Sequence, residues 1–286
     1  MTAPSPFPWP IAAPSFVIPA HIEENALFLS GKVREVGLCL FESASCLAYG
    51  PHELPRRLAD LPLEWHLHLP LDLPWQDGGD TAAEICRALL EKTRHLHPRC
   101  AVLHPPAPAD REEAPLLLRR FLRQWRRHNG STPPLLLENT RSCDLTALTD
   151  IMAAEGCGVC LDTGHCLGFA QEALAEHAWL LSRVRLVHWS APGAGDRHLP
   201  LTALTPAQHA RLCRLARRLP RQARHMLEIF SWPELAASEP VLRTLLRREE
   251  AARDGQTIPR RQPEERGEAR GPEQKYLASQ NVVAGH

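Results

Sequence analysis

The chain alternates short aliphatic runs with segments of helical periodicity, and it does so eight times between residues 14 and 248. Most of the runs are bounded by turn residues, as expected for buried parallel strands. Strands that alternate with helices over roughly 250 residues are typical of a (β/α)8 TIM barrel. A doubly wound open sheet is the alternative, because the alternation alone does not require closure. The predicted strands are 14–18, 36–41, 65–69, 101–103, 135–137, 159–161, 184–187 and 226–227.

The intervening segments carry start and stop signals for helices. Thr205 followed by Pro206 is a favoured helix start, and Gly156 is a favoured residue just after a helix end. One predicted helix buries a single apolar face, made by Leu118, Phe121, Leu122 and Trp125. The sequence therefore predicts one catalytic barrel at 14–248, between a disordered N-terminal tail at 1–13 and a disordered C-terminal tail at 249–286.

Charge and cysteine content exclude several classes of protein. Lys+Arg and Asp+Glu are both 33, so no net field draws the protein to nucleic acid, which is not an expected partner. The nine cysteines are an odd number without a repeated framework, which favours a reducing compartment over disulfide scaffolding. No apolar run approaches the ~18 residues of a membrane span. A soluble, cytoplasmic protein is expected, with no membrane partner.

The residues that follow the aliphatic runs predict a function. One acid or imidazole at a strand end is usually structural, but seven of the eight runs here are followed by His, Asp or Glu. In a barrel these positions converge on the C-terminal rim, where divalent cations neutralise clustered carboxylates. The sequence therefore predicts a metal site at that rim. The strand-end residues are Glu42, His66, His68, His104, Glu138, Asp162, His188 and Glu228.

Several motifs then resemble one superfamily. In chain order, the motifs are His104-Pro105, Glu138-Asn139-Thr140, Cys160-Leu161-Asp162-Thr163-Gly164-His165, His188-Trp189-Ser190, Asp196-Arg197-His198 and Leu227-Glu228. Together they resemble the xylose-isomerase-like TIM barrels, particularly the endonuclease IV (AP endonuclease 2) branch.

That resemblance implies a site for two or three divalent ions, with zinc expected first and manganese or iron as alternatives. The first ion would be held by His68, His104 and Glu138, with His68 chosen over His66 because His68-Leu-Pro resembles the end of the third strand. The second would be held by Glu138, Asp162, His188 and Glu228, and the third by His165, Asp196 and His198. Glu138, Glu228 and His165 are the implied catalytic residues. A complete ligand set resembles phosphoester chemistry, in which metal-activated water attacks phosphorus.

Other segments resemble the bacterial cobamide-remodelling phosphodiesterases. The segments are Pro14-Ser-Phe-Val-Ile-Pro19, Glu35-Val-Gly-Leu-Cys-Leu-Phe-Glu42, Leu47-Ala-Tyr-Gly50 and His66-Leu-His-Leu-Pro-Leu-Asp-Leu-Pro-Trp75. The implied substrate is a corrinoid whose nucleotide loop is cut to cobinamide phosphate and an α-riboside. An AP-endonuclease-like nuclease is the second reading, weakened because Arg141-Ser142-Cys143 replaces a glycine-rich loop, and a sugar isomerase or epimerase is the third. Expected substrate contacts are Glu42, His66, Trp75 and Arg197; a structural acid is the alternative for Glu42, and a position behind the metal ligands is the alternative for His66.

Overall fold

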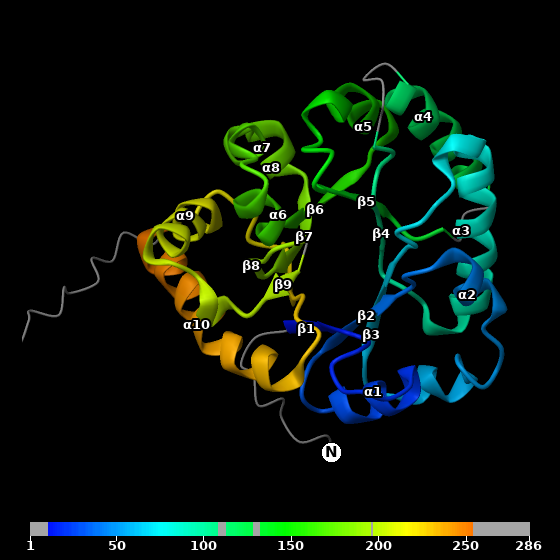
Figure 1. Ribbon diagram of the computed structural model, residues 1–286, viewed down its shortest axis with the longest axis horizontal. Helices are drawn as coiled ribbons and strands as arrows, with labels where there is room; N and C mark the ends of the chain where they lie inside the picture. Colours follow the sequence, from blue (N-terminus) through cyan, green and yellow to red (C-terminus); the bar gives the residue numbers. More distant parts are fainter. Residues whose placement is uncertain (1–10, 108–112, 128–131, 196, 254–286) are drawn as a thin grey trace, which may run out of the picture.

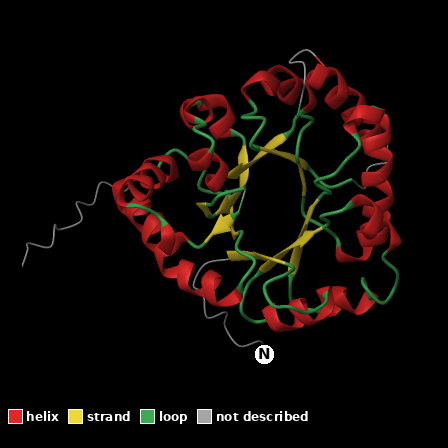
Figure 2. Ribbon diagram, viewed as in Figure 1, coloured by secondary structure: helices red, strands yellow, loops and turns green. Residues whose placement is uncertain are grey.

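The computed structural model describes residues 11–107, 113–127, 132–195 and 197–253. Eight parallel strands close into a barrel in the order β1-β10-β7-β6-β5-β4-β3-β2. The strands form a ring inside a layer of helices (Figures 1 and 2), so the closed barrel is confirmed and the open sheet is excluded. The barrel strands are β1 (Ile11–Pro14), β2 (Glu35–Cys39), β3 (Glu64–His68), β4 (Ala101–Leu103), β5 (Leu135–Glu138), β6 (Gly158–Asp162), β7 (Val184–Trp189) and β10 (Arg224–Leu227).

A small antiparallel hairpin lies outside the barrel, in the connection that follows β7. It pairs β8 (Ala191–Pro192) with β9 (His198–Leu199). The α-helices are α1 (Ile22–Leu29), α2 (Ser43–Ala48), α3 (Gly79–Thr93), α4 (Glu113–Arg126), α5 (Thr149–Glu155), α6 (Thr163–Gly168), α7 (Glu172–Glu176), α8 (Ala178–Ser182), α9 (Pro206–Ala216) and α10 (Trp232–Arg253). The 3-10 turns are η1 (Arg56–Asp60), η2 (Trp75–Asp77), η3 (Arg94–Leu96), η4 (Thr146–Leu148) and η5 (Leu201–Ala203).

The predicted helix signals are confirmed. Thr205 caps α9 in a reciprocal pair with Gln208, and Gly156 ends α5 with a φ of +65°. The four apolar residues predicted to share a face of α4 are all buried. The arginines of the same helix lie on its exposed side.

The first strand was predicted at the wrong place. It spans Ile11–Pro14 instead of 14–18, so buried residues that were assigned to the N-terminal tail belong to the barrel. After Ser15 the chain leaves the sheet, because the amides of Val17 and Ile18 both donate to Asn25 Oδ1, at 2.8 and 3.0 Å. Apolar side chains at these positions are therefore buried outside the strand.

The predicted C-terminal boundary at residue 248 falls within α10, which continues to Arg253. The remainder of the two predicted tails, residues 1–10 and 254–286, lies outside the described residues. Among the helices that the structure describes, none is both long enough and apolar enough to cross a membrane.

The interior of the barrel has an apolar layer and a charged network. The apolar layer consists of Ala12, Cys100, Val102, Leu136, Cys160, Leu186 and Met226. Glu35, from the start of β2, accepts hydrogen bonds from Arg224 and from Nδ1 of His66. Burial alone would raise the pKa of Glu35, but the nearby His66 and Arg224 lower it to about 2. This network lies beneath the rim and ties β2, β3 and β10 together.

Candidate metal centre

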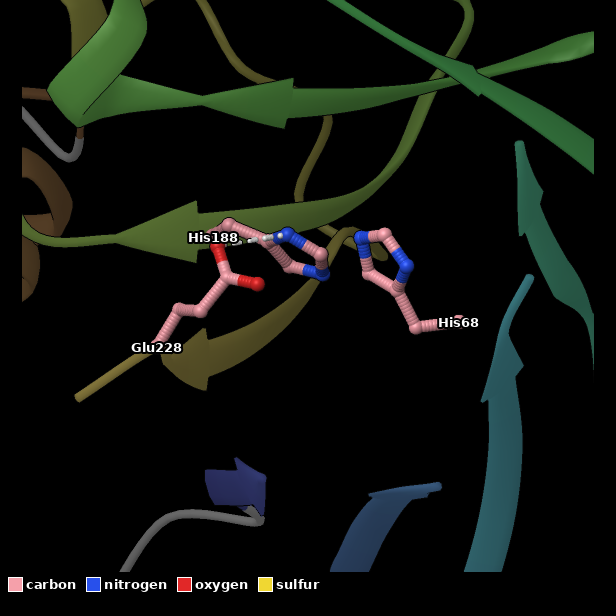
Figure 3. Close-up of side chains that lie close together, drawn as sticks. All are labelled: His68, His188 and Glu228. Atoms are coloured by element: carbon pink, nitrogen blue, oxygen red, sulfur yellow. Dashed lines mark ion pairs between the residues drawn. The ribbon is translucent and has the colours of Figure 1, made fainter. Parts of the chain in front are cut away.

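The carboxyl ends of five strands bring acids and imidazoles into one buried volume. Figure 3 shows three of them, His68 from β3, His188 from β7 and Glu228 just after β10, pointing toward one another. Asp162 ends β6 directly beside His188 in register, and Glu138 ends β5. All five side chains are buried. The barrel register therefore produces the convergence that the strand-end pattern predicts.

Glu138 is the centre of this cluster, because its two carboxylate oxygens face different sides of it. Oε2 lies 3.1 Å from Nε2 of His68 and 3.6 Å from Nε2 of His104. Oε1 lies 3.4 Å from Nδ1 of His188 and 3.9 Å from Nδ1 of His165. One carboxylate thus reaches two separate sets of ligand atoms.

Glu228 has a similar connecting position on the opposite side. Its Oε2 atom lies 3.0 Å from Nδ1 of His188, the ion pair drawn in Figure 3, and 3.6 Å from Nδ1 of His198. Nδ1 of His198 is also 3.8 Å from Oδ2 of Asp162. Glu228 therefore joins the His188 side of the cluster to the His198 side.

Local sequence explains the position of Asp162 and His165. Asp162 caps α6, accepting from the amide of His165 at 2.5 Å. Asn139 exchanges hydrogen bonds with the backbone of Asp162, which fixes the end of β5 against the end of β6. Gly164 is required by close approach, because a Cβ atom there would lie 2.4 Å from Ser190 Oγ. Ser190 Oγ in turn lies 3.2 Å from Nδ1 of His198.

Several of these side chains have orientations suited to ligands. His68 Nδ1 pairs with the carbonyl of Leu69 at 3.0 Å, and His165 Nδ1 pairs with the carbonyl of Asn139 at 2.7 Å. A carbonyl only accepts, so in both rings Nδ1 carries a proton, which leaves Nε2 as the nitrogen that could bind a cation. Asp162 Oδ2 and His188 Nε2 are buried and make no hydrogen bond to a described residue. Such buried polar atoms need a partner, and a cation fits them.

Potential ligand atoms within 4.8 Å of one another form several groups among the described residues. Eight of the nine expected ligands occur in these groups, and Asp196 lies outside the described residues. The third group in the structure contains Asp162 together with His165 and His198, whereas Asp162 was expected only in the second group. The residues fit divalent ions with mixed nitrogen and oxygen ligands. The main groups are His68, His104 and Glu138; Glu138, Asp162, His188 and Glu228; and Asp162, His165 and His198.

Protonation in the cluster follows from burial and from the close charges. Burial raises the pKa of Asp162 to about 6, against the opposing effect of His165 and His198. For Glu138 and Glu228, burial is outweighed by the adjacent imidazoles, and both pKa values are lowered. Burial alone would lower the pKa of His188, but Cys160 and then these two carboxylates raise it well above its usual value. The cluster thus keeps anionic carboxylates buried, and a bound cation would stabilise their negative charge.

Two residues on the barrel interior have contacts that the sequence did not indicate. His66 is completely buried and paired with Glu35 at 2.7 Å, and it belongs to none of the ligand groups. It lies beneath the cluster and pairs with an acid there, and its expected contact with substrate stays a prediction. Cys160 is not among the expected ligands, yet its sulfur groups with Glu138 and His188. The alternation of side chains along β6 could have identified it, since Cys160 and Asp162 face the same way.

The other expected substrate contacts are separated from one another. Arg197 is exposed and lines a small hollow with His165 and His198. Glu42 is an exposed residue at the start of α2, and its carboxylate accepts from Ser45 Oγ at 3.0 Å. Trp75 is half-buried, and its ring packs 5.5 Å from that of Phe121 in the helical layer, so its expected contact with substrate stays a prediction.

A cavity of about 330 Å³ lies beside the cluster and was not expected from the sequence. Its lining includes Arg141 and Phe169, whose ring is 5.6 Å from that of His165. Leu145 and Ala170, near or in its wall, have φ values of +65° and +51°, a conformation that costs energy outside glycine. The shape of this cavity depends on the geometry of the loops, so the sequence motifs do not predict it.

No protein-family model and no curated protein matches this sequence. The fold and cluster define a (β/α)8 barrel with a candidate metal centre at its C-terminal rim, and solved structures share that fold. A D-tagatose 3-epimerase-like protein is 16% identical with a TM-score of 0.63, covering 85% of this chain and 98% of its own. Endonuclease IV from Thermus thermophilus is 20% identical with a TM-score of 0.58, at 83% and 98% coverage. The IOLI protein, solved with a bound zinc atom, is 12% identical with a TM-score of 0.55, at 85% and 96% coverage.

Other similar structures are described as xylose isomerase domain proteins. At these identities the likeness is one of fold. The expectation of a (β/α)8 barrel is therefore confirmed, and the reaction must be argued from the site.

Proposed function

We propose that this chain is a divalent-metal-dependent phosphodiesterase that cleaves the nucleotide loop of cobamides, releasing cobinamide phosphate and an α-riboside. The observation that carries the proposal is the division of the Glu138 carboxylate between His68 and His104 on one side and His188 on the other. A carboxylate placed in this way suits a site for more than one cation, and such sites are common in phosphoester hydrolysis.

In this reaction water adds its oxygen to phosphorus, the bond from phosphorus to the ribose oxygen breaks, and that oxygen takes up a proton. Bound divalent ions would supply Lewis-acid chemistry, activating water and stabilising charge on the leaving oxygen. The eight described ligands would hold them, with zinc proposed first. The chain positions these ligands through the backbone carbonyls of Leu69 and Asn139, which fix two imidazole rings.

The cobamide substrate is proposed from the segments around Glu42 and His66 to Trp75, which resemble the cobamide-remodelling enzymes. The balanced charge and the solvated basic face of α4 support a small-molecule substrate over DNA. The proposed setting is the cytoplasm, without a membrane partner.

One parallel assay separates this function from the two alternatives. Metal-replete protein is incubated with an adenosylated cobamide, with abasic DNA and with ketoses, and the products are identified by mass spectrometry. The proposal expects cobinamide phosphate and the α-riboside in the first reaction and unchanged substrate in the others. Cleavage of abasic DNA alone, or isomerisation of a ketose alone, would replace the proposal with the corresponding alternative.

A further inference from the structure

Three phenylalanines form a continuous aromatic surface on the barrel rim, which we call the aromatic rim patch (Phe16, Phe41 and Phe230). The ring centroids of Phe16 and Phe41 are 5.7 Å apart, and those of Phe41 and Phe230 are also 5.7 Å apart. The three residues follow β1, β2 and β10, which are adjacent strands in the barrel. The patch therefore lies on the same rim as the candidate metal centre.

Exposure of these rings is unusual for the molecule. Phe41 and Phe230 are each 37% exposed, while Phe16 packs on the core behind them. Leu71, which is 49% exposed, lies beside Phe41 because its amide donates to the Phe41 carbonyl at 3.1 Å. Most of the exposed large apolar side chains among the described residues thus gather here. A contiguous exposed apolar surface marks a place where a ligand binds.

The aromatic rim patch is continuous with the metal ligands. The ring centroids of Phe230 and His198 are 5.9 Å apart, with an angle of 67° between the ring planes. Nδ1 of His198 lies 3.6 Å from Oε2 of Glu228. A flat group stacked on Phe230 is consequently a neighbour of the centre where the proposed phosphoester reacts.

We propose that the aromatic rim patch binds a flat apolar ring that is part of the substrate and is joined to its phosphoester. The inference rests on the proposed function, which offers two such rings, the corrin macrocycle and the base of the lower ligand. Both contain a conjugated ring system, and stacking on an aromatic side chain is insensitive to the finer chemistry of the ring. Loss of one stacking partner weakens binding about fivefold to a hundredfold.

The test measures binding of two product fragments to the metal-replete protein, so that cleavage does not interfere. Cobinamide phosphate carries the corrin without the base, and the α-riboside carries the base without the corrin. Titration calorimetry compares wild type with Phe41→Ala and Phe230→Ala, and with Phe41→Leu, which keeps apolar volume but removes the flat face. Leu116→Ala is the matched control, since Leu116 is 61% exposed on α4, away from the rim. Melting temperature and metal content are measured for every variant.

The expected result is a rise of about fivefold or more in the Kd of one fragment in all three phenylalanine variants, with Leu116→Ala unchanged. The fragment affected identifies the stacked ring, and the KM for the intact cobamide rises by a similar factor. Wild-type binding of neither fragment, or equal Kd values in the wild type and the folded variants, would overturn the inference. If cobamide cleavage still occurs in that case, the proposed function stands without it. If fragment binding depends on the phenylalanines but no cobamide is cleaved, the proposed function fails and the ring site remains.

Discussion

At the scale of the residue, the candidate centre depends on a few side chains with two contacts each. Glu138 faces His68 with one oxygen and His188 with the other, and Glu228 reaches both His188 and His198. Because these contacts are shared, no single ligand group is independent of the next. Substitution of one shared carboxylate should therefore affect the whole cluster.

Glu138→Gln should keep the fold but lower both metal content and turnover. Glutamine keeps the volume of the side chain but removes the negative charge that faces two ligand groups. The expected loss in cobamide cleavage is on the order of 10³ or more, because a metal-dependent reaction loses its activated nucleophile. Elemental analysis and initial rates measure both effects. Glu84→Gln, an exposed change on α3, is the control. Full metal content with a rate within a few-fold of wild type would contradict the assignment.

His225 should make the protein less stable in mild acid. Burial lowers the pKa of this imidazole to about 4, and its Nδ1 accepts from Trp189 Nε1 at 3.0 Å. In the unfolded chain the pKa of this imidazole is about 6.5, so between pH 6.5 and 4 the unfolded chain binds a proton that the folded protein does not bind. Stability is thus complete above pH 6.5 and falls as the pH drops toward 4, by up to about 3 kcal/mol.

The corresponding variant is His225→Gln, which keeps an acceptor for Trp189 but does not titrate. Urea unfolding at pH 7 and pH 4.5, with chelator present in all samples, should show a smaller loss of stability in the variant than in wild type. The same loss in both proteins would mean that His225 is already protonated in the folded state.

Residue-scale prediction from the sequence succeeded where chemistry and position coincide. An acid or imidazole after an aliphatic run is conspicuous, and the parallel register makes His188 and Asp162 neighbours. Phe41 and Phe230 carry no such signal, because an exposed aromatic and a core aromatic look alike in sequence. The cavity beside Arg141 was not predicted from the sequence either, since its shape depends on the loops that follow β5 and β6.

At the scale of the element, the barrel is supported by helices that pack closely around it. The pair α3 and α4 contacts at Gly79, where a Cβ atom would lie 2.0 Å from the carbonyl oxygen of Leu117. Trp75 and Phe121 extend the same interface. The backbone approach at Gly79 therefore sets the spacing of these two helices.

Gly79→Ala should destabilise the protein by about 1–3 kcal/mol, because the added methyl group forces α3 away from α4. The control is Gly50→Ala, where the nearest heavy atom to a new Cβ is Glu53 Oε2 at 3.6 Å, an ordinary contact. The free energy of unfolding in urea measures both. Equal stability of the two variants would show that the helices move apart without cost.

Element boundaries show what the sequence could not determine. The strand at Ala101–Leu103 was predicted with its observed limits, since proline and polar residues bound a short aliphatic run. The first strand was misplaced because Val17 and Ile18 look more strand-like than Ile11–Pro14. The deciding interaction is the Asn25 side chain, which captures the amides of Val17 and Ile18 from a helix eight or seven residues away.

At the scale of the whole molecule, closure of the barrel is what gives the cluster its meaning. His68 and Glu228 are 160 positions apart in the sequence but lie in one ligand group with His188. Folding therefore brings several carboxylates together in a buried interior, and without a bound cation their charges are not compensated. Such convergence is costly without a counterion, so the stability of the barrel should be coupled to metal binding.

Removal of divalent metal should therefore lower the melting temperature of the whole protein. A ligand present at 100 times its Kd stabilises the folded state by about 2.7 kcal/mol, which for a chain of this size corresponds to roughly 5 °C or more. Calorimetry of protein before and after chelation, and after restoration with zinc, manganese or iron, gives the shift for each ion. Glu138→Gln should reduce the shift, since it weakens two ligand groups at once, while Leu116→Ala should show the wild-type shift. An identical melting temperature in chelated and zinc-loaded wild type, despite measured zinc binding, would place that zinc outside the barrel rim, because ions held by these buried ligands must bind the folded chain in preference to the unfolded one.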